Sequence, residues 1–170
     1  MGVVYRLDRP TSGIVIFART SKALSRLNEA LRDKAIQKTY WAIVKNPIQK
    51  NTDTLIHYLQ KNQKNNKSTA FITEKQGAKK AVLHYKIVKT FDNYSLLEVD
   101  LKTGRHHQIR VQLAKIGCPI KGDLKYGFDR SNKDGGIHLH ARKIGLLHPV
   151  SKKDIEIVAP TPKDVIWDIC

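Results

Sequence analysis

The sequence predicts an α+β protein, and three observations support that fold class. Residues 37–45, 80–87 and 94–102 alternate apolar and polar side chains, as half-buried strands do. Residues 22–33 and 105–116 instead repeat apolar side chains every three or four positions, which is typical of amphipathic helices. The chain has 170 residues, of which 41% are hydrophobic, enough for one domain with a real core.

The first elements surround a polar turn. Residues 3–5 predict a short strand that runs into the turn, and residues 14–18 have the length and branched composition of a buried strand. Thr20 or Ser21 can cap the helix expected at 22–33. The apolar face of that helix is made by Leu24, Leu27 and Leu31. We expect it to pack on the sheet.

The middle of the chain predicts strands separated by one uncertain region. Residues 54–59 can form a strand. Residues 61–68 predict an exposed basic loop that can contact phosphates, or equally a disordered excursion. Residues 80–87 and 94–102 are joined by 91–93 and predict an antiparallel hairpin.

The helix expected at 105–116 follows a turn at Thr103-Gly104 and ends at Gly117. Arg110 lies beside its apolar stripe, so this arginine needs an anionic partner in the interior. Residues 137–147 and 155–158 predict strands, and Pro162 predicts the first turn of a short terminal helix.

Charge is the strongest bulk property. Lys and Arg total 31 against 15 Asp and Glu, giving a formal net charge of +16. A field of that sign favours polyanions, with RNA first, DNA second and an anionic membrane surface a poor third. Such binding weakens steeply with salt.

Other features narrow the setting. No apolar run reaches the length of about 18 residues that a membrane span needs, and the amino terminus lacks a signal-peptide pattern. Cys118 and Cys170 do not form a metal-type pair or a disulfide framework. We therefore expect a reduced, cytoplasmic protein without a membrane partner. A monomer with no obligate protein partner is the simplest expectation.

One short segment combines charge with a sharp turn. In Arg6-Leu7-Asp8-Arg9-Pro10-Thr11-Ser12-Gly13, the Asp8 carboxylate stands between two guanidinium groups, which favour its ionised form. Such a carboxylate on a loop held by a strand can act as a nucleophile toward an electrophilic sugar carbon. The local pattern also fits a polar turn with a weak surface ion pair.

Several segments together resemble one enzyme family. Arg6-Leu7-Asp8 with Thr11-Ser12-Gly13 resembles the signature loop of the RluA-type pseudouridine synthases, which isomerise uridine in ribosomal or transfer RNA. Further motifs follow in the family's order: Lys38-Thr39-Tyr40-Trp41-Ala42, the segment from Thr103 to Val111, Pro119-Ile120-Lys121-Gly122-Asp123 with Tyr126-Gly127, Leu139-His140-Ala141 and His148-Pro149. The resemblance therefore spans Asp8 to Pro149.

The resemblance implies a mixed, mainly antiparallel sheet with helices packed on it and an active cleft across the sheet. It implies an isomerase that breaks the bond between uracil nitrogen and the ribose anomeric carbon, rotates the base and rejoins it through carbon. The uridine must leave its stack, which costs a few kcal/mol in a duplex. This chemistry needs no cofactor and no metal.

The resemblance also assigns residues. Asp8 is the essential carboxylate, which attacks the anomeric carbon or removes a sugar proton to give a glycal. Arg110 pairs with Asp8, and Tyr40 stacks on the detached uracil and assists proton transfer. Substrate contacts are expected from Arg6, Leu139, Arg105 and His107.

Two departures from the family pattern stand out. Tyr5 occupies a position where the family usually has His. The chain also begins just before the signature loop, without the usual amino-terminal strand pair, the Asn-Lys-Pro motif or a small RNA-binding domain. We therefore expect a shortened member of the family or a fragment, with residues 1–170 as its catalytic domain.

Three rival interpretations remain. A metal could gather the histidines at 106, 107, 138 and 140, but no Cys or HExxH-type helix accompanies them, and hydrogen bonding is the simpler role for His107 and His140. A catalytically inactive RNA-binding module derived from the family is the main functional alternative. A DNA-binding regulator is disfavoured because no recognition helix follows a tight turn.

Overall fold

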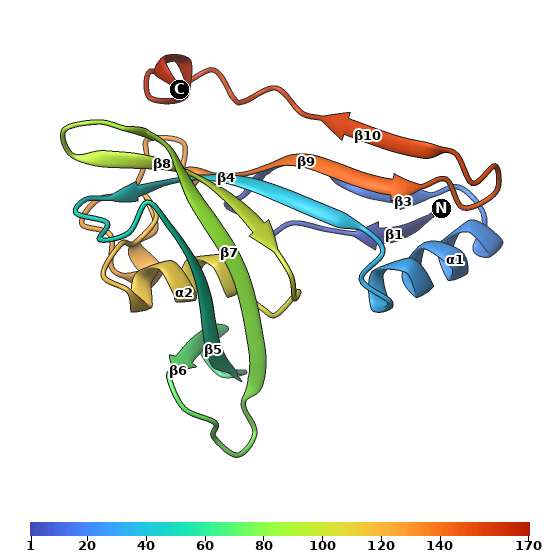
Figure 1. Ribbon diagram of the computed structural model, residues 1–170, viewed down its shortest axis with the longest axis horizontal. Coiled ribbons are helices and arrows are strands. Elements are labelled where there is room, and N and C mark those ends of the chain that lie inside the picture. The colour runs from blue at the N-terminus through green and yellow to red at the C-terminus, as the bar shows by residue number, and fades with distance from the viewer.

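The computed structural model describes residues 1–170, and Figure 1 shows a long curved sheet with one helix at each end. The strands are β1 (Gly2–Tyr5), β2 (Ser12–Gly13), β3 (Ile16–Ala18), β4 (Gln37–Lys45), β5 (Thr52–Asn62), β6 (Lys67–Phe71), β7 (Lys79–Thr90), β8 (Tyr94–Leu101), β9 (Leu139–Leu147) and β10 (Asp154–Val158). The α-helices are α1 (Ser21–Arg32) and α2 (Gln108–Lys115), and short 3-10 helices occupy Leu124–Tyr126 and Trp167–Ile169.

The main sheet has eight strands in the order β10-β9-β4-β8-β7-β5-β6, with β2 pairing beside β9. All of its pairings are antiparallel except that of β2 with β9. The strands β1 and β3 form a separate two-stranded sheet. The prediction of an α+β fold with a mixed, mainly antiparallel sheet is confirmed.

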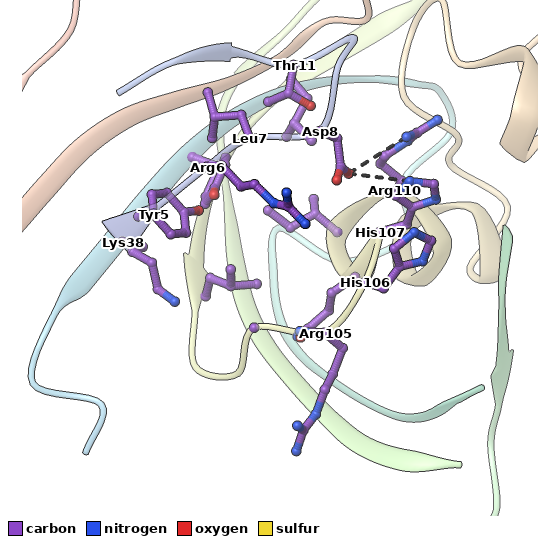
Figure 2. A pocket seen from close by; sticks show the side chains of 16 residues that line it. Tyr5, Arg6, Leu7, Asp8, Thr11, Lys38, Arg105, His106, His107 and Arg110 are labelled. Carbon is purple, nitrogen blue, oxygen red and sulfur yellow. Dashed lines mark hydrogen bonds and ion pairs between the residues drawn. The ribbon is translucent and has the colours of Figure 1, made fainter. Parts of the chain in front are cut away.

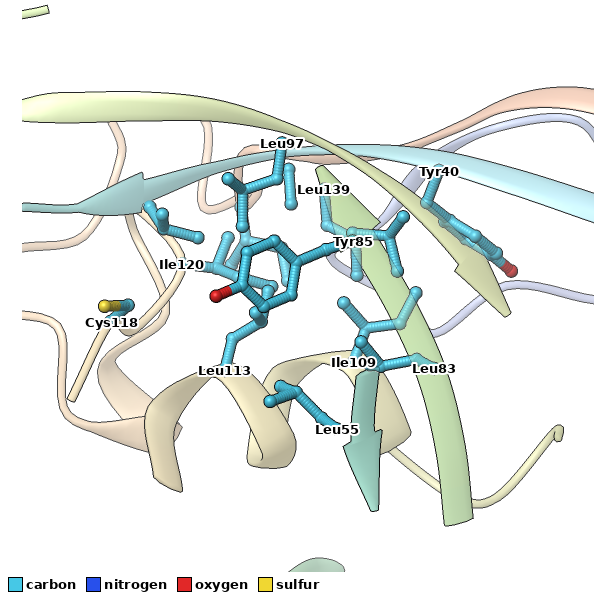
Figure 3. Close-up of a cluster of buried hydrophobic side chains, with 14 of the residues drawn as sticks. Tyr40, Leu55, Leu83, Tyr85, Leu97, Ile109, Leu113, Cys118, Ile120 and Leu139 are labelled. Atoms are coloured by element: carbon cyan, nitrogen blue, oxygen red, sulfur yellow. The ribbon is translucent and has the colours of Figure 1, made fainter. Parts of the chain in front are cut away.

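The main core lies between the sheet and α2. Figure 3 shows side chains of β4, β5, β7 and β8 meeting α2 and the segment that follows it. Leu83, Leu97, Leu113 and Ile120 are fully buried there. Burial of each such side chain contributes about 1.5–3 kcal/mol, so this contact holds α2 against the sheet.

The central strand β4 is covered on both faces. Tyr40, Ala42 and Val44 belong to the main core, as the alternation in the sequence predicts. Ile43 faces the opposite side and packs with Leu96 and Trp167, which the terminal segment brings across the sheet.

The helix α1 follows its prediction in bounds and cap, but it does not pack on the main sheet. The Thr20 hydroxyl accepts a hydrogen bond from the Ala23 backbone N–H at 3.1 Å, so Thr20 is the cap. Leu27 is buried against Val4 and Ala18, so the helix covers the small β1–β3 sheet rather than the main one.

The prediction of a buried strand at residues 14–18 is wrong, because the strand is shorter and one of its faces is exposed. Only Ile16–Ala18 form a strand, and its one partner is β1. Val15 and Phe17 remain 41% and 53% exposed. A strand in a two-stranded sheet with a helix on one face leaves its other face open, which apolar composition alone does not reveal.

The expected loop at 61–68 is instead the end of a hairpin. β5 continues to Asn62 and β6 begins at Lys67, where Lys61 pairs with Ser68. The polar composition reflects an exposed turn at 63–66 in which Asn62 and Asn65 side chains accept backbone N–H groups.

The helix expected from residue 105 begins at Gln108. The Gln108 side chain accepts hydrogen bonds from the Arg105 backbone N–H at 3.0 Å and from the Thr103 hydroxyl at 2.8 Å. This side chain closes a turn ahead of the helix, so residues 105–107 form a loop. His107 adopts a left-handed backbone conformation with φ of 52°.

The prediction that the terminal helix opens at Pro162 is wrong. The helical turn lies at Trp167–Ile169, after Asp164. The Asp164 carboxylate accepts from the Ile166 backbone N–H at 2.9 Å and also bonds the His138 ring at 2.9 Å, so the turn starts after this residue. Neither α-helix has the length or apolar composition needed to cross a bilayer.

Buried histidines make the fold sensitive to acid. Burial is the largest cause that lowers the pKa values of His57, His107, His138 and His140 below their ordinary range. The unfolded chain therefore binds protons between about pH 7 and pH 5 that the folded chain does not bind.

We expect the free energy of unfolding to fall as the pH is lowered from about 7 to about 5, before most carboxylates titrate. Urea unfolding followed by circular dichroism at a series of pH values measures this dependence. An unfolding free energy that stays constant or rises over this window would contradict the buried, neutral state of these rings.

Candidate active site

A hollow of about 360 Å³ opens between the loop that follows β1, the sheet and the start of α2 (Figure 2). Its size is within the usual range for small-molecule sites. All of the site residues that the sequence predicted line it, namely Arg6, Asp8, Tyr40, Arg105, His107, Arg110 and Leu139. Asp8 is the only acidic residue of the lining.

The loop that carries Asp8 is held at its two ends. The Thr11 backbone N–H donates to the Asp8 carbonyl at 2.9 Å and closes the turn. Ser12 and Gly13 then pair with His140 and Ala141 of β9. A Cβ atom at Gly13 would lie 2.4 Å from the Ala141 carbonyl oxygen, so this close approach requires glycine.

Arg110 is buried on α2 and has a full anionic partner that sequence reasoning missed. Its Nε and Nη2 atoms donate to the two oxygens of Asp123 at 2.7 and 2.8 Å. The third nitrogen, Nη1, lies 3.7 Å from the Asp8 carboxylate. The expected pairing with Asp8 is therefore present but secondary, because Asp123 carries the close bidentate contact.

The charges around Arg110 favour its cationic form. Burial opposes the charge, but the hydrogen bonds and charge of Asp123, together with the charge of Asp8, raise the pKa of Arg110 above its ordinary value. The guanidinium carbon also lies 5.0 Å from the centre of the Tyr126 ring. Arg110 is thus a fixed cation that presents one free nitrogen to Asp8.

His107 approaches Asp8 from the other side, with Nε2 at 3.8 Å from the carboxylate. Burial, with the charge of Arg110, lowers the pKa of His107 to about 3, so the ring is neutral. Its Nδ1 atom lies 2.8 Å from the Tyr126 hydroxyl, which accepts from the Ser68 backbone N–H at 2.9 Å. The negative charge of the Asp8 carboxylate beside Nε2 favours the tautomer that carries its proton on Nε2, in which Nδ1 accepts from the Tyr126 hydroxyl.

Tyr40 and Leu139 supply the apolar part of the hollow. Both are buried members of the main core that also line the site. Figure 3 shows the Tyr40 hydroxyl directed away from the core cluster. A flat aromatic ring beside an aliphatic side chain suits an uncharged planar ring.

Lys38 and Tyr5 also line the hollow, and sequence reasoning assigned them no role there. The Lys38 ammonium lies 5.4 Å from the centre of the Tyr5 ring, and burial lowers the pKa of Lys38. Burial, with the charge of Asp8, raises the pKa of Tyr5. Lys38 stands two residues before Tyr40 on one strand, so the period of two could have placed it on the same face.

The two exposed arginines of the lining differ in direction. Figure 2 shows Arg6 reaching across the hollow, whereas the Arg105 guanidinium points away from Asp8. The Arg105 Nε atom donates to the Lys80 carbonyl at 3.1 Å. Arg105 therefore extends the positive surface beyond the hollow.

The histidines of the rival metal interpretation do not converge. His106 and His107 stack at 3.7 Å, but His138 bonds Asn132 and Asp164, and His140 bonds Ser12. No group of three or more metal-ligating side chains is assembled in the structure. His140 has the structural role that hydrogen bonding predicted.

Comparison with known proteins identifies the family of the chain. Residues 1–115 match the family model described as RNA pseudouridylate synthase. The chain belongs to the RNA pseudouridylate synthase family. This confirms the resemblance read from the motifs, and the family is one of isomerases.

Curated relatives carry the same family name. An RNA pseudouridine synthase of Chloroflexus aurantiacus that is described as uncharacterised is 38% identical over 169 residues, which cover 96% of this chain and 51% of the relative. Ribosomal large subunit pseudouridine synthase D of Zymomonas mobilis is 33% identical over 174 residues, covering 96% of this chain and 54% of the relative. The chain thus spans about half the length of these members of the RNA pseudouridylate synthase family.

A solved structure shows the same fold. Human RNA pseudouridylate synthase domain containing 1 superimposes with a TM-score of 0.80 at 24% sequence identity, covering 99% of this chain and 72% of that chain. The arrangement of the sheet and helices is therefore that of a pseudouridylate synthase domain.

Asp123→Asn removes the charge that neutralises Arg110 in the interior. Arg110 and Asp123 are 5% and 1% exposed, so we expect the free energy of unfolding to fall by about 3–5 kcal/mol, as for other broken buried ion pairs. Urea unfolding monitored by fluorescence measures the loss. The matched control is Asp129→Asn, which removes the exposed partner of Lys45 and should cost less than about 1 kcal/mol. Equal effects of the two variants would contradict the importance of the buried pair.

Proposed function

We propose that this chain is the catalytic domain of an RNA pseudouridine synthase that converts uridines of ribosomal or transfer RNA to pseudouridine. The observation that carries the proposal is the position of Asp8, whose carboxylate faces Arg110 and His107 inside a hollow that Tyr40 and Leu139 also line. Membership of the RNA pseudouridylate synthase family supports it. The protein would act on RNA as a cytoplasmic monomer.

Asp8 would be the essential carboxylate. Arg110 places a cation 3.7 Å from this carboxylate, and Nε2 of neutral His107 faces it at 3.8 Å without adding a second positive charge. Such a carboxylate can attack the ribose anomeric carbon, or it can remove a sugar proton to give a glycal. In either course the glycosidic carbon–nitrogen bond breaks and the uracil is released as a bound ring.

The detached ring must turn before it rejoins the sugar. Tyr40 and Leu139 offer an aromatic face and an aliphatic face in the same hollow, which would hold the ring while it rotates. The new bond joins the anomeric carbon to carbon 5 of uracil. The hydrogen on that carbon leaves as a proton, and the nitrogen that was bound to the sugar takes up a proton, so the product is an isomer of the substrate. The Tyr40 hydroxyl would assist that transfer, and no other reactant is consumed.

The cationic lining suits the remainder of the substrate. Arg6, Lys38 and Arg105 surround the hollow together with Arg110, against the single carboxylate of Asp8. Arg6 can grip a flanking phosphate or occupy the space that the flipped uridine leaves. The formal net charge of +16 supports RNA as the partner.

Asp8→Asn tests the proposal directly. With RNA tritiated at carbon 5 of uracil, we expect the wild-type protein to release tritium and the variant to release none, because the amide neither attacks nor accepts a proton. RNA affinity should stay within about twofold, since the carboxylate acts on the reaction rather than on the phosphates. Asp129→Asn, which alters an exposed carboxylate elsewhere, is the matched control.

The same assay distinguishes the isomerase from a non-catalytic RNA-binding module. If the wild-type protein binds RNA but releases no tritium from total cellular RNA, the isomerase is contradicted and a non-catalytic RNA-binding module is supported.

Tyr40→Phe keeps the aromatic ring and removes the hydroxyl. If this hydroxyl moves the proton, we expect kcat for tritium release to fall about 100-fold with little change in KM. The control is Tyr94→Phe, at a half-buried position on β8 outside the hollow. An unchanged kcat for Tyr40→Phe would leave Tyr40 only the stacking role.

A further inference from the structure

A second hollow, of about 350 Å³, adjoins the candidate active site. Both hollows are lined by Gly104, Arg105 and His106, so the loop before α2 forms the wall between them. The remaining lining comes from the hairpin end of the sheet, at Leu59, Lys61, Ser68, Gly77 and Lys79. No acidic side chain lines this second hollow.

The register of the strands places the two lysines of the second hollow on the same face of the sheet. Lys61 lies two residues after Leu59 on β5, so both side chains point to the same side of the sheet. Lys79 of β7 pairs directly with Leu59, and Ser68 of β6 pairs directly with Lys61. Directly opposed residues share a face, so Lys61, Ser68 and Lys79 converge by the construction of the sheet.

The cations of this hollow are unpaired. Neither Lys61 nor Lys79 forms a salt bridge with a carboxylate of the chain, and the guanidinium group of Arg105 donates only through Nε, to the Lys80 carbonyl. The terminal nitrogens of the Arg105 guanidinium group point away from Asp8 and remain available (Figure 2). Three cations without an internal counterion form a site for an external anion.

His106 fixes the wall between the hollows. Its Nδ1 atom lies 2.9 Å from the hydroxyl of buried Ser68, and its ring stacks on His107 at 3.7 Å. Burial and the nearby charge of Lys61 lower the pKa of His106, which disfavours a positive charge on this ring. The loop is therefore tied to β6 on one side and to the candidate active site on the other.

We propose that Lys61, Lys79 and Arg105 form a binding site for a backbone phosphate of the RNA strand, next to the nucleotide whose uracil enters the first hollow. This inference rests on the proposed function, because it assumes that a uridine occupies the neighbouring hollow. The site positions the strand through charge and carries no base specificity. It sets the register in which a uridine reaches Asp8.

The salt dependence of RNA binding tests the site. The double variant Lys61→Gln/Lys79→Gln changes exposed side chains and should leave the fold intact, which circular dichroism checks. Binding to a fluorescent single-stranded oligouridylate is measured across a series of KCl concentrations. For each phosphate that the variant no longer neutralises, the slope of log K against log salt should fall in magnitude by about 0.7.

A matched control removes the same charge elsewhere. Lys22 on α1 and Lys163 before the terminal turn are exposed and form no salt bridge. Figure 1 shows both segments well away from the β5–β6 hairpin. We expect Lys22→Gln/Lys163→Gln to keep the wild-type slope. Equal slopes for the two double variants, whether reduced or not, would overturn the site.

A second experiment locates the phosphate. Oligoribonucleotides with one uridine among cytidines carry a single uncharged methylphosphonate linkage at successive positions. When the uncharged linkage stands at one position beside the uridine, the affinity of the wild-type protein should fall about tenfold, which corresponds to about 1.4 kcal/mol. The affinity of the Lys61→Gln/Lys79→Gln protein should not change at that position. Equal sensitivity of both proteins at every linkage would overturn the assignment.

Failure of the proposed function is separable from failure of this site. In one outcome the wild-type protein releases no tritium, and the slope of log K against log salt is smaller in magnitude for the Lys61→Gln/Lys79→Gln protein but unchanged for the Lys22→Gln/Lys163→Gln control. The isomerase is then contradicted and the phosphate site is supported. If tritium is released and the slopes are equal, the isomerase is supported and the site is overturned.

Discussion

The buried ion pair between Arg110 and Asp123 is the contact on which the site depends. A guanidinium group that is 5% exposed inside a hydrophobic core is tolerated only when an anion takes its donors in good geometry. Asp123 takes two of them, and the nitrogen that remains is aimed at Asp8. One contact thereby joins α2, the turn after it and the loop after β1, which are distant in the sequence.

The same cluster determines how the Asp8 carboxylate is surrounded. Tyr126 lies against the Arg110 guanidinium and bonds the His107 ring, so one side chain orients both neighbours of Asp8. Because His107 is buried beside a permanent cation, it stays neutral and contributes a dipole rather than a second charge. The result is one carboxylate facing one fixed cation and one oriented N–H group, an arrangement that needs little reorganisation when a substrate arrives.

Cations that have no internal partner surround this compact centre. Inside the fold, Arg110 and Asp123 neutralise each other. The second hollow instead presents unpaired cations to an external polyanion, namely Lys61, Lys79 and the terminal nitrogens of Arg105. The excess of basic residues thus divides into a few that build the fold and many that remain at the surface. This division explains how a chain with a net charge of +16 can still contain a dense apolar core.

Local pattern in the sequence determined most element types, two candidates for the cap of α1 and the faces of β4, because periodicity is a property of the chain itself. The order of the family motifs indicated the residues that meet around Asp8. Local pattern did not determine where α2 and the terminal turn begin, because the Gln108 and Asp164 side chains decide those boundaries by hydrogen bonds. Nor did it reveal that Asp123 is the main partner of Arg110 or that Lys61 and Lys79 converge. Those relations arise only when strand register and helix packing bring separated segments together in three dimensions, and no local pattern encodes such distances.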